Sequence, residues 1–486
     1  MQPIMIQATS SDAGKTTIVA GLCRLFANRG YKVTPFKSQN MALNSYVTES
    51  GEEIARATAV QAFGARQAPI KHMNPLLLKP KADDVSQLIV HGKALRDVTS
   101  KEYFLSNALQ GLKLAAIRES INYLRQHYDL IIAEGAGSCA EPNLRELDVV
   151  NMGLAHELQA RVIIVADIDR GGVFADILGS LKVMEIVRPD DIGLIDGFII
   201  NKFRGDRDVL QPAIDFIEGQ TKLPVLGVLP YINDIKLEEE DRVKEYRCEN
   251  PEVDIAVIHL PHISNANDFD FLAEEENVQV RFVKSPDSLG LPDAIIIPGS
   301  KNTVWDLDYL RRIGLERAIK KSAGSTPVIG VCGGYQMLGH TLRDDDRVES
   351  ELGTIAGMGL LDIGVEFLPN KTVINRKYTL TSNDIFGPVG MLSGYEIHCG
   401  VVRYGDCKPM FEYEGGYDGA IHPEKFIFGT FIHDVFSNRA FTRAFVNNLR
   451  RAKGLAPLTT DLPGARDHMD ESYEKLAAML EQYASF

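Results

Sequence analysis

The sequence has few cysteines and no hydrophobic run long enough to cross a lipid bilayer. Six cysteines are scattered over 486 residues, and no two of them form a CxxC pair. This scarcity argues against a disulfide framework and against a structural zinc site. The lack of a bilayer-length apolar run argues against an integral membrane protein. Met1-Gln2-Pro3 has no basic region, so we expect no secretory signal peptide and a cytoplasmic chain with reduced thiols.

Positive charge is also in short supply. Lys and Arg number 52 against 66 Asp and Glu, which gives a formal net charge of −14. Nucleic acids and anionic membranes bind surfaces with a surplus of positive charge, so neither is expected as a main partner. The composition is otherwise ordinary, with 45% hydrophobic and 24% charged residues. A chain of this length is too long for one compact core, which predicts two or three domains.

Short apolar strands alternate with helical patterns along most of the chain, which predicts a parallel α/β fold. Several of these strands are apolar throughout, as expected for strands that are buried on both faces. The expected strands are Ile4–Ala8, Leu130–Ala133, Val162–Ala166, Gly197–Ile200 and Val225–Leu229 in the first half, and Ile255–Leu260, Val278–Phe282, Ala294–Ile297 and Val328–Val331 in the second.

The pattern is interrupted once, by a charged stretch after Pro230. We therefore place a domain boundary near residue 250 and expect a solvated linker there. Near the C-terminus, Tyr473–Leu480 has the pattern of an amphipathic helix. The expected organisation is a nucleotide-binding domain at 1–233, a linker at 234–251, a second α/β domain at 252–450 and a helical extension at 451–486.

A phosphate-binding loop is predicted close to the N-terminus. Gly14-Lys15-Thr16-Thr17 follows the first expected strand and precedes a helical pattern at Ile18–Ala27. In this context, backbone N–H groups and the helix N-terminus face a phosphate anion. Lys15 would neutralise the outer phosphates of ATP, and the Thr16 hydroxyl would ligate Mg²⁺. The usual leading glycine is absent from this loop.

Three more segments bring polar residues to the carboxyl ends of buried strands, where ligands bind in open α/β sheets. Glu134 ends one strand and is a candidate Mg²⁺ ligand, because Mg²⁺ prefers carboxylate oxygens. Asp169 and Arg170 follow the next strand and suit contacts with metal, phosphate or a substrate carboxylate. Asn201 and Lys202 end a third strand, where the amide would face the adenine edge.

A nucleophile elbow is predicted in the second half. Cys332 follows the strand Val328–Val331, is followed by Gly333 and Gly334, and precedes a helical pattern. Glycines permit the tight turn that exposes such a nucleophile, and the helix N-terminus stabilises an anion. The Gly333 N–H would supply one oxyanion donor. The turn at Gly299-Ser300 would supply the second.

The base that activates the thiol must come from elsewhere in the chain. His433, at the end of the apolar run that starts at Phe428, is the preferred candidate. His398 and His422 are its rivals. Sequence spacing alone leaves the choice among the three histidines open.

Six motifs in one order carry a resemblance to a known family. With them the chain resembles, over nearly its whole length, the cobyric acid synthase family of glutamine-hydrolysing enzymes in cobalamin biosynthesis. The resemblance implies a first domain similar to dethiobiotin synthetase, a P-loop protein, and a second similar to the class I glutamine amidotransferases. The motifs are Gln39–Ser45, Asn74–Pro80, Glu134–Ser138, Asp169–Phe174, Ile200–Asp206 and Gly394–His398.

Class I amidotransferases hydrolyse glutamine with a Cys-His-Glu triad, in which the Glu stands two residues beyond the His. Val435 holds that place here, after His433. The cobyric acid synthase branch likewise lacks this Glu, so the departure supports the branch. It leaves open which group orients the imidazole, and Glu396 and a backbone carbonyl are the two candidates.

The activity implied by the resemblance is the amidation of four peripheral carboxylates (b, d, e and g) of adenosylcobyrinic acid a,c-diamide, giving adenosylcobyric acid. Its implied ligands are ATP, Mg²⁺, glutamine and this corrinoid. Lys15, Thr16 and Glu134 would serve phosphoryl transfer, while Cys332 and His433 would release ammonia. Asp148 is the candidate residue beside the accepting carboxylate.

Two other functions are compatible with parts of this pattern. A related enzyme, cobyrinic acid a,c-diamide synthase, shares the nucleotide and thiol chemistry but should differ at Gln39–Ser45 and Asn74–Pro80. A P-loop partitioning ATPase with an inactive glutaminase-like module is the second alternative. The intact Cys332 elbow and His433 argue against it.

Overall fold

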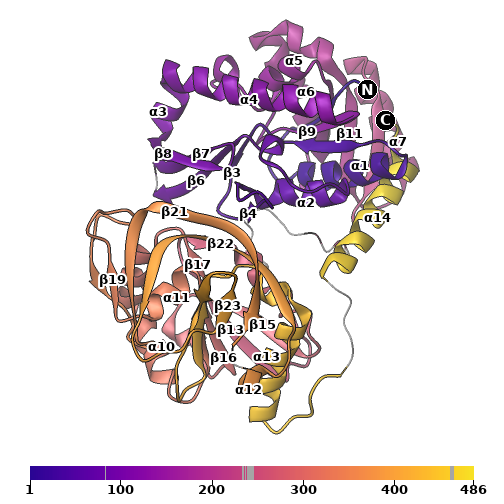
Figure 1. Ribbon diagram of the computed structural model, residues 1–486. Helices are drawn as coiled ribbons and strands as arrows, with labels where there is room; N and C mark the ends of the chain where they lie inside the picture. Colours follow the sequence, from indigo (N-terminus) through magenta and orange to yellow (C-terminus); the bar gives the residue numbers. More distant parts are fainter. Residues whose placement is uncertain (83, 233–234, 236, 238–245, 382, 460–464) are drawn as a thin grey trace.

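The chain folds into two α/β lobes, with the N-terminal half in the indigo-to-magenta lobe and most of the second half in the orange lobe (Figure 1). The computed structural model describes residues 1–82, 84–232, 235, 237, 246–381, 383–459 and 465–486. The predicted linker 234–251 falls largely outside the described residues. Each lobe is organised around its own mainly parallel sheet.

A six-stranded parallel sheet forms the centre of the first lobe, in the order β12-β11-β10-β1-β9-β2. All five strands predicted for this half are present, which confirms the parallel-sheet interpretation. Their apolar composition is explained by helices on both faces, each of which encloses a hydrophobic cluster. The strands are β1 (Ile4–Ala8), β2 (Val33–Phe36), β9 (Leu130–Glu134), β10 (Arg161–Asp167), β11 (Ile195–Phe203) and β12 (Val225–Pro230).

The helices of this lobe follow the strands in alternation. On one face lie α1 (Lys15–Asn28) and α2 (Arg56–Gly64), and on the other α4 (Asn107–His127), α5 (Met152–Leu158) and α6 (Val173–Val187). Because α1 starts directly after β1, its N-terminus opens at the carboxyl edge of the sheet. That edge is where the predicted phosphate loop stands.

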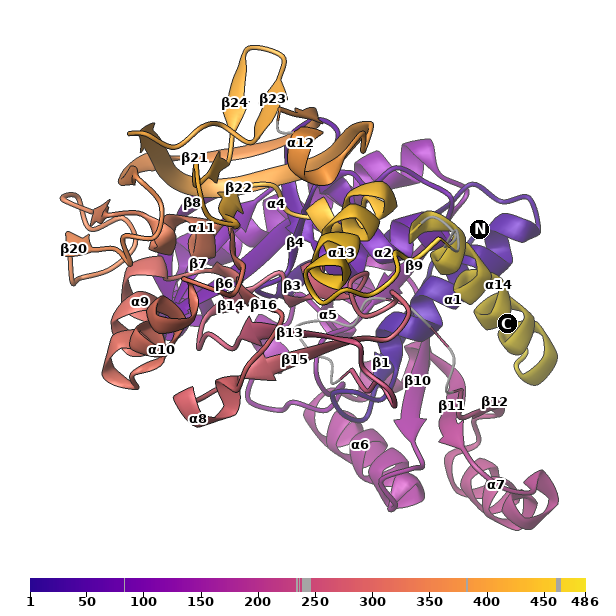
Figure 2. The same cartoon turned by 90° about the horizontal axis from the view of Figure 1, so that it is seen from below.

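The C-terminal helix returns to the first lobe. α14 (Ala465–Tyr483) lies beside α1 in both ribbon views (Figures 1 and 2). The buried Arg24 guanidinium of α1 pairs with Asp470 at 2.6 Å and Glu474 at 2.8 Å. Tyr473 donates from its hydroxyl to Val60 O at 2.6 Å. The predicted amphipathic helix at Tyr473–Leu480 is confirmed, and its apolar face completes the core around α1.

The first lobe also carries a small sheet that the sequence analysis did not predict. It has the order β3-β6-β7-β8, with β3 (Gln39–Met41), β6 (Leu76–Ala82), β7 (Val85–Val90) and β8 (Lys93–Thr99). A two-stranded pair, β4 (Ser45–Val47) with β5 (Glu53–Ala55), stands beside it. Two of the family motifs, Gln39–Ser45 and Asn74–Pro80, lie in these additions.

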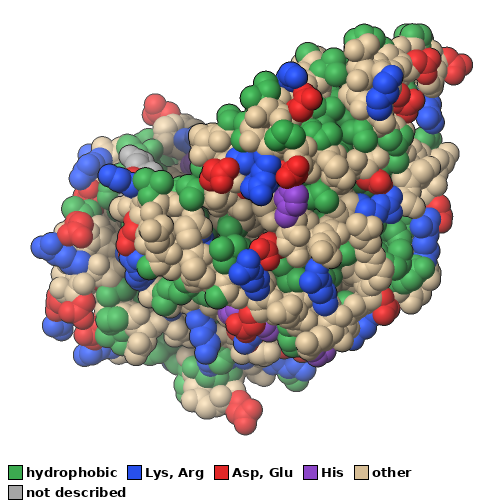
Figure 3. Space-filling view, turned by 90° about the horizontal axis from the view of Figure 1, so that it is seen from above, with side chains coloured by type: hydrophobic (Ala, Val, Ile, Leu, Met, Phe, Trp, Pro, Cys, Tyr) green, Lys and Arg blue, Asp and Glu red, His purple; other side chains and the backbone are tan. Residues whose placement is uncertain are grey.

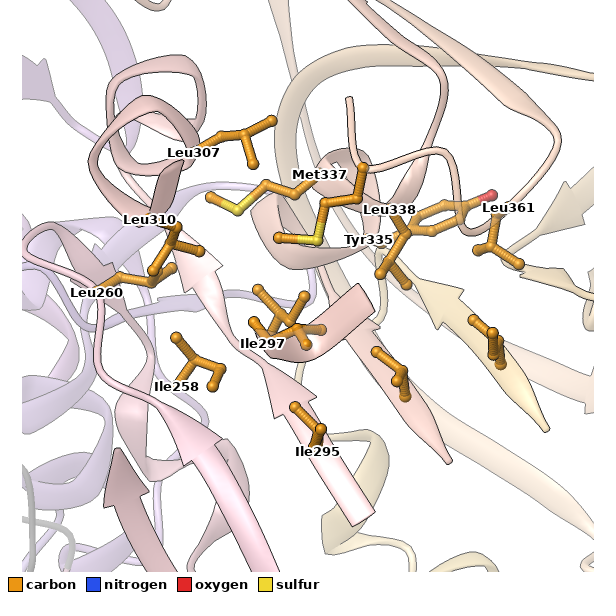
Figure 4. Packing of buried hydrophobic residues seen from close by; sticks show 14 of the residues in the cluster. Ile258, Leu260, Ile295, Ile297, Leu307, Leu310, Tyr335, Met337, Leu338 and Leu361 are labelled. Carbon is orange, nitrogen blue, oxygen red and sulfur yellow. The ribbon is translucent and has the colours of Figure 1, made fainter. Parts of the chain in front are cut away.

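The second lobe has a sheet in the order β15-β13-β16-β18-β26-β25, parallel except for β25. The four strands predicted for this half are all present. Figure 4 shows the core on one face, where Ile295 and Ile297 of β16 pack against Leu307, Leu310 and Met337. The strands are β13 (Val253–Ile258), β15 (Val278–Val283), β16 (Ala294–Ile297), β18 (Val328–Val331), β25 (Ala420–Ile421) and β26 (Ile427–Thr430).

A long antiparallel hairpin of the second lobe faces the first lobe. It consists of β21 (Ile363–Leu380) and β22 (Met391–Tyr404), and Figure 1 shows β21 at the boundary between the lobes. Val373, Tyr395 and Ile397 of the hairpin share a hydrophobic cluster with Val47 of β4. The two lobes therefore meet through the hairpin on one side and the β4–β5 pair on the other.

The outer surface mixes charges of both signs. On the face seen in Figure 3, acidic and basic side chains are interspersed and form no continuous basic area. Within the described ranges, every helix is too short or too polar to cross a membrane.

Candidate active sites

The phosphate loop stands between β1 and α1, as predicted. Gly14 has a φ of +101° and precedes the first turn of α1, which contains Lys15, Thr16 and Thr17. A methyl group added at Gly14 would lie 2.3 Å from Nδ2 of Asn201. This amide donates to Ala13 O at 2.8 Å. Glycine is therefore required both by the left-handed conformation and by the close approach of Asn201.

Lys15, Thr16 and Glu134 meet at the mouth of the loop. Lys15 Nζ donates to Gly137 O at 2.9 Å and to Ser10 O at 3.2 Å. Thr16 Oγ1 donates to Glu134 Oε1 at 2.9 Å. Since Lys15 is held by loop carbonyls, its ammonium is already positioned where an incoming phosphate would compete for it.

Two residues that the sequence analysis missed hold the Glu134 carboxylate. Lys37 Nζ lies 3.0 Å from Oε1 in an ion pair whose side chains are both almost fully buried. Gln61 donates from Nε2 to Oε2. Lys37 directly follows β2, and Gln61 lies in α2. Because both are distant from Glu134 in sequence, no local motif predicted them.

The donor set at this point suits Mg²⁺. Thr16 Oγ1 and Glu134 Oε1 are hard oxygens lying side by side, of the kind that Mg²⁺ combines with phosphate oxygens. The buried oxygens Gln61 Oε1 and Thr9 Oγ1 have no hydrogen-bond partner within the described part of the chain. Buried polar atoms in that condition usually belong to a site for water, ion or ligand.

A charged network forms the rim of the loop. Lys202 Nζ donates to Asp12 O and to the buried Asp167 Oδ2, both at 2.7 Å. Arg170 lies 3.3 Å from Asp12 Oδ2 and 3.7 Å from Asp167 Oδ2. The structure thus brings the predicted Lys202 and Arg170 to the loop.

The other two predicted substrate residues differ in their relation to that network. Asp169 donates from its backbone N–H to Asp167 Oδ1 at 2.9 Å, and its own Oδ1 accepts from Arg204 Nε at 3.1 Å on the exposed rim. Asp148 accepts from the backbone N–H groups of Val150, Asn151 and Gly153, each at 2.8 Å. Asp148 therefore holds the start of α5 in this structure.

The thiol site is an elbow between β18 and α11 (Gly333–Leu338). Cys332 has a φ of +51°, a conformation that costs energy for a residue with a side chain. Room for this turn comes from glycine, since a methyl group at Gly334 would lie 1.9 Å from Ile297 O. Cys332 is 7% exposed, and its Sγ lies 3.5 Å from Ile397 O.

His433 is the histidine that faces Cys332. A methyl group added at Gly299 would lie 3.2 Å from His433 Cε1 and 3.7 Å from Cys332 Cβ, so the three residues meet at one point. The rivals are engaged elsewhere. His398 Nε2 lies 3.0 Å from Glu396, and the half-buried His422 accepts at Nδ1 from the N–H groups of Glu424 and Lys425.

Asp268 orients the imidazole of His433. Its Oδ2 lies 2.7 Å from His433 Nδ1, and its Oδ1 accepts from Asp434 N at 3.0 Å. Neither candidate from the sequence does this, because Glu396 bonds Tyr378 and His398 and the partner of His433 Nδ1 is a side-chain carboxylate rather than a backbone carbonyl. Burial would lower the pKa of His433, but Asp268 and Cys332 outweigh burial and raise this pKa to about 10. The imidazolium form is thus favoured beside the thiol.

The two predicted oxyanion segments converge on the same point. A methyl group at Gly333 would lie 2.8 Å from the backbone N of Ser300. The backbone of Gly299-Ser300 is itself fixed by pairing with Ile263-Ser264. The Gly333 and Ser300 amides therefore stand close together next to Cys332, as an oxyanion hole requires.

The thiol site encloses a cavity that includes a residue of the other lobe. Its volume is about 30 Å³, which is room for about one or two water molecules. Lys79 of β6 lines it together with Cys332, His433, Lys301 and Lys371.

Several further contacts between the lobes touch the thiol site directly. Glu53 of β5 pairs with Lys79 of its own lobe at 2.9 Å and with Lys371 of the hairpin at 2.5 Å. Burial opposes ionisation of Glu53, but the two ammonium groups hold its pKa far below the usual range. Arg56 of α2 pairs with Asp434, the residue after His433, at 2.8 Å.

A second set of contacts fixes Tyr395, whose ring stacks on His433 with centroids 5.3 Å apart. The Tyr395 hydroxyl donates to Ser45 O at 2.9 Å and accepts from Asn265 Nδ2 at 2.6 Å. Ser45 ends the motif Gln39–Ser45. The motif thus helps to position the ring that stacks on His433, although it belongs to the first lobe.

Comparison with known proteins agrees with the division of the chain into a lobe with the phosphate loop and a lobe with the thiol site. Residues 4–243 match the family described as CobQ/CobB/MinD/ParA nucleotide binding domain, and residues 254–441 match the CobB/CobQ-like glutamine amidotransferase domain. Cobyric acid synthase of Dehalococcoides mccartyi (strain CBDB1) is 45% identical over 489 residues, covering 98% of this chain and 95% of the relative.

Two further relatives extend this finding. The probable cobyric acid synthase of Methanothermobacter thermautotrophicus is 46% identical, covering 94% of this chain and 92% of its own. Cobyric acid synthase of Clostridium botulinum (strain Loch Maree / Type A3) is 43% identical, covering 99% and 97%. The chain therefore belongs to the cobyric acid synthase family, the glutamine-dependent amidating ligases of cobalamin biosynthesis.

Proposed function

We propose that the chain amidates the b, d, e and g carboxylates of adenosylcobyrinic acid a,c-diamide, using one glutamine and one ATP for each. The observation that carries this proposal is the 43–46% identity to the three relatives over nearly full length. Those relatives bear the cobyric acid synthase name, which favours this substrate over that of cobyrinic acid a,c-diamide synthase.

The phosphate loop would perform the first half of the reaction. A carboxylate is a poor electrophile, so its oxygen first attacks the γ-phosphorus of ATP and forms an acyl phosphate with release of ADP. Lys15 and the loop amides would hold the phosphates during this transfer. Mg²⁺, held by Thr16 and Glu134, would neutralise the phosphate charge.

The thiol site would supply the nitrogen. Cys332 attacks the side-chain amide carbon of glutamine, while the Gly333 and Ser300 N–H groups stabilise the oxyanion. The His433 imidazolium donates its proton to the departing ammonia, and water then hydrolyses the γ-glutamyl thioester. Asp268 keeps His433 in the required orientation throughout.

Ammonia would pass between the sites without entering bulk solvent. This part of the proposal is supported by Lys79 of the first lobe, which lines the cavity at Cys332. Ammonia then displaces phosphate from the acyl phosphate and gives the amide. External amine should therefore compete poorly during turnover with glutamine, and efficient interception would contradict this route.

The test is to incubate the protein with adenosylcobyrinic acid a,c-diamide, glutamine and Mg-ATP and to follow the corrinoid by mass spectrometry. Four successive acid-to-amide mass changes are expected. Glutamine hydrolysis without any change in the corrinoid would keep the amidotransferase activity and overturn the substrate. A partitioning ATPase with an inactive module would hydrolyse no glutamine at all.

A further inference from the structure

A cluster of three metal-ligating side chains lies in the first lobe, away from both active sites. His72 stands in the short 3-10 helix Lys71–Met73, His91 in the turn between β7 and β8, and Glu119 on α4. One donor atom from each of the three lies within 4.8 Å of the others. Three separate elements therefore converge on one point with two imidazoles and a carboxylate.

The hydrogen bonds of His91 leave one ring nitrogen for a metal. Its Nε2 lies 3.2 Å from Ala116 O, a carbonyl that can only accept, so Nε2 carries the proton. In the neutral ring Nδ1 is then unprotonated. Nδ1 lies 3.9 Å from Glu119 Oε2, too far for a hydrogen bond. A lone pair and a carboxylate oxygen facing each other at this separation match two ligands of one cation.

His72 is prepared in a similar way. Its Nδ1 lies 3.2 Å from Ser120 Oγ, and the same hydroxyl lies 2.9 Å from His91 Nε2. Bonds from the distal nitrogen to a neighbouring group are what orient metal-binding histidines.

Backbone hydrogen bonds fix the position of the His91 turn. His91 has a φ of +45° and Gly92 a φ of +75°, the positive values that a two-residue turn between the antiparallel strands β7 and β8 requires. The His91 N–H donates to Pro75 O at 2.8 Å, and Gly92 O accepts from Glu53 N at 3.0 Å. His91 therefore reaches the cluster from a backbone that is bonded to two other segments of the first lobe.

We propose that His72, His91 and Glu119 bind one divalent transition-metal ion, with Zn²⁺ the best match. Two imidazoles and one carboxylate are a ligand set that zinc accepts, with water in the fourth position. Ligand atoms of a tetrahedral zinc lie about 3.3 Å apart, so the cluster must contract slightly. Glu119 makes this possible, because its side chain is 64% exposed.

The cysteine spacing used in the sequence analysis does not bear on this site, since no cysteine takes part. A bound ion would tie α4 to the His91 turn and, through Gly92 O, support Glu53. Glu53 carries the ion pairs with Lys79 and Lys371 between the lobes. The ion would thus have a structural role that reinforces the lobe contact.

The test is a zinc titration of the full chain after chelator treatment, in the Cys332→Ala background so that the thiol site cannot bind the ion. Calorimetry should show one site, and zinc should raise Tm because it binds only the folded state. Co²⁺ should give the absorption bands of a tetrahedral complex. His91→Ala and Glu119→Gln should each weaken zinc binding at least about 100-fold, and Ser120→Ala about 10- to 100-fold.

The matched control is His127→Ala. His127 lies on the same helix and stacks on Tyr123, which also stacks on His72, but it is outside the cluster. This variant should bind zinc like the parent. Glu119 is exposed, so Glu119→Gln keeps the test valid even where a histidine variant folds poorly. Equal zinc affinity in the parent, His91→Ala and Glu119→Gln would overturn the proposal, as would absence of any zinc binding by the parent.

Discussion

The two reaction centres of this chain differ in how complete they are before any ligand binds. At the phosphate loop, Lys15 is held by the carbonyls of Ser10 and Gly137, and the rim residues Asp12 and Arg170 are more than half exposed. At the thiol site, by contrast, Cys332, His433 and Asp268 are all buried, and His433 Nδ1 already lies 2.7 Å from Asp268 Oδ2. The rim cation Arg170 thus remains accessible to an incoming polyanion, although Lys15 behind it is only 8% exposed. The histidine of the thiol site, in contrast, is already held by its carboxylate partner.

The difference extends to what each centre needs from the other lobe. The loop is built wholly from the first lobe, whereas the walls of the thiol site include Lys79 and are supported by Ser45 and Arg56 of that lobe. We therefore expect the phosphate loop to work on its own and the glutaminase to depend on the lobe contact. Four substitutions test this difference between the phosphate loop and the thiol site.

The largest effect is expected from Cys332→Ala. Loss of the nucleophile should reduce glutamine-dependent amidation by about 10⁶-fold, because no thioester can form. Amidation with added ammonia should remain near the parent rate, since the phosphate loop is untouched. Cys399→Ala is the control, because Cys399 lines the same cavity without standing at the elbow. Loss of ammonia-dependent activity in Cys332→Ala would show that the centres are not separable.

Asp268→Asn should lower kcat for glutamine hydrolysis by about 10⁴-fold through loss of imidazole orientation. The pH profile should also change. Against the effect of burial, Asp268 and Cys332 together raise the pKa of His433 to about 10, so removal of the Asp268 charge lowers that pKa, and the alkaline limb of activity should move to lower pH.

The control for Asp268 is Glu396→Gln, which removes the carboxylate that bonds His398 and not His433. It should leave the alkaline limb in place. The stability readout has a defined sign: a raised histidine pKa stabilises the fold fully below pH 6.5 and less as pH approaches 10. The urea midpoints of parent and Asp268→Asn should therefore differ more at pH 6 than at pH 10.

Lys15→Ala tests the other centre. Removing one preorganised cation from the transferred phosphate should slow both glutamine- and ammonia-dependent amidation by about 10²- to 10³-fold. Glutamine hydrolysis without ATP should be unchanged, because Lys15 belongs to the phosphate loop alone. A large fall in that basal hydrolysis would contradict the separation of the centres.

The smallest effect is expected from Arg56→Ala, which removes the ion pair with Asp434 across the lobe contact. A coupling of this kind is worth about 1–3 kcal/mol, so we expect about a tenfold fall in amide formed per glutamine hydrolysed. Arg66→Ala is the matched control, since it removes an exposed ion pair with Glu474 inside the first lobe. An equal effect in both variants would exclude a specific role for Arg56.

The sequence predicted the parallel strands, the phosphate loop and the nucleophile elbow correctly because each has a local signal. Buried parallel strands are continuous apolar runs, and both turns need small residues directly beside the functional side chain. The small sheet β3-β6-β7-β8 escaped notice because its longer strands are not continuous apolar runs: β6 contains Lys79 and Pro80, and most residues of β8 are exposed.

What the sequence by itself determined is therefore the local frame of each centre: the loop before α1 that carries Lys15 and Thr16, and the elbow that carries Cys332. Only the tertiary structure decided which residues support them. Asp268 meets His433 across 165 positions of sequence, Lys79 reaches the glutaminase cavity from the other lobe, and His72, His91 and Glu119 converge from three elements. Such contacts depend on how whole elements pack against one another, and the spacing of neighbouring residues in the sequence does not specify that packing.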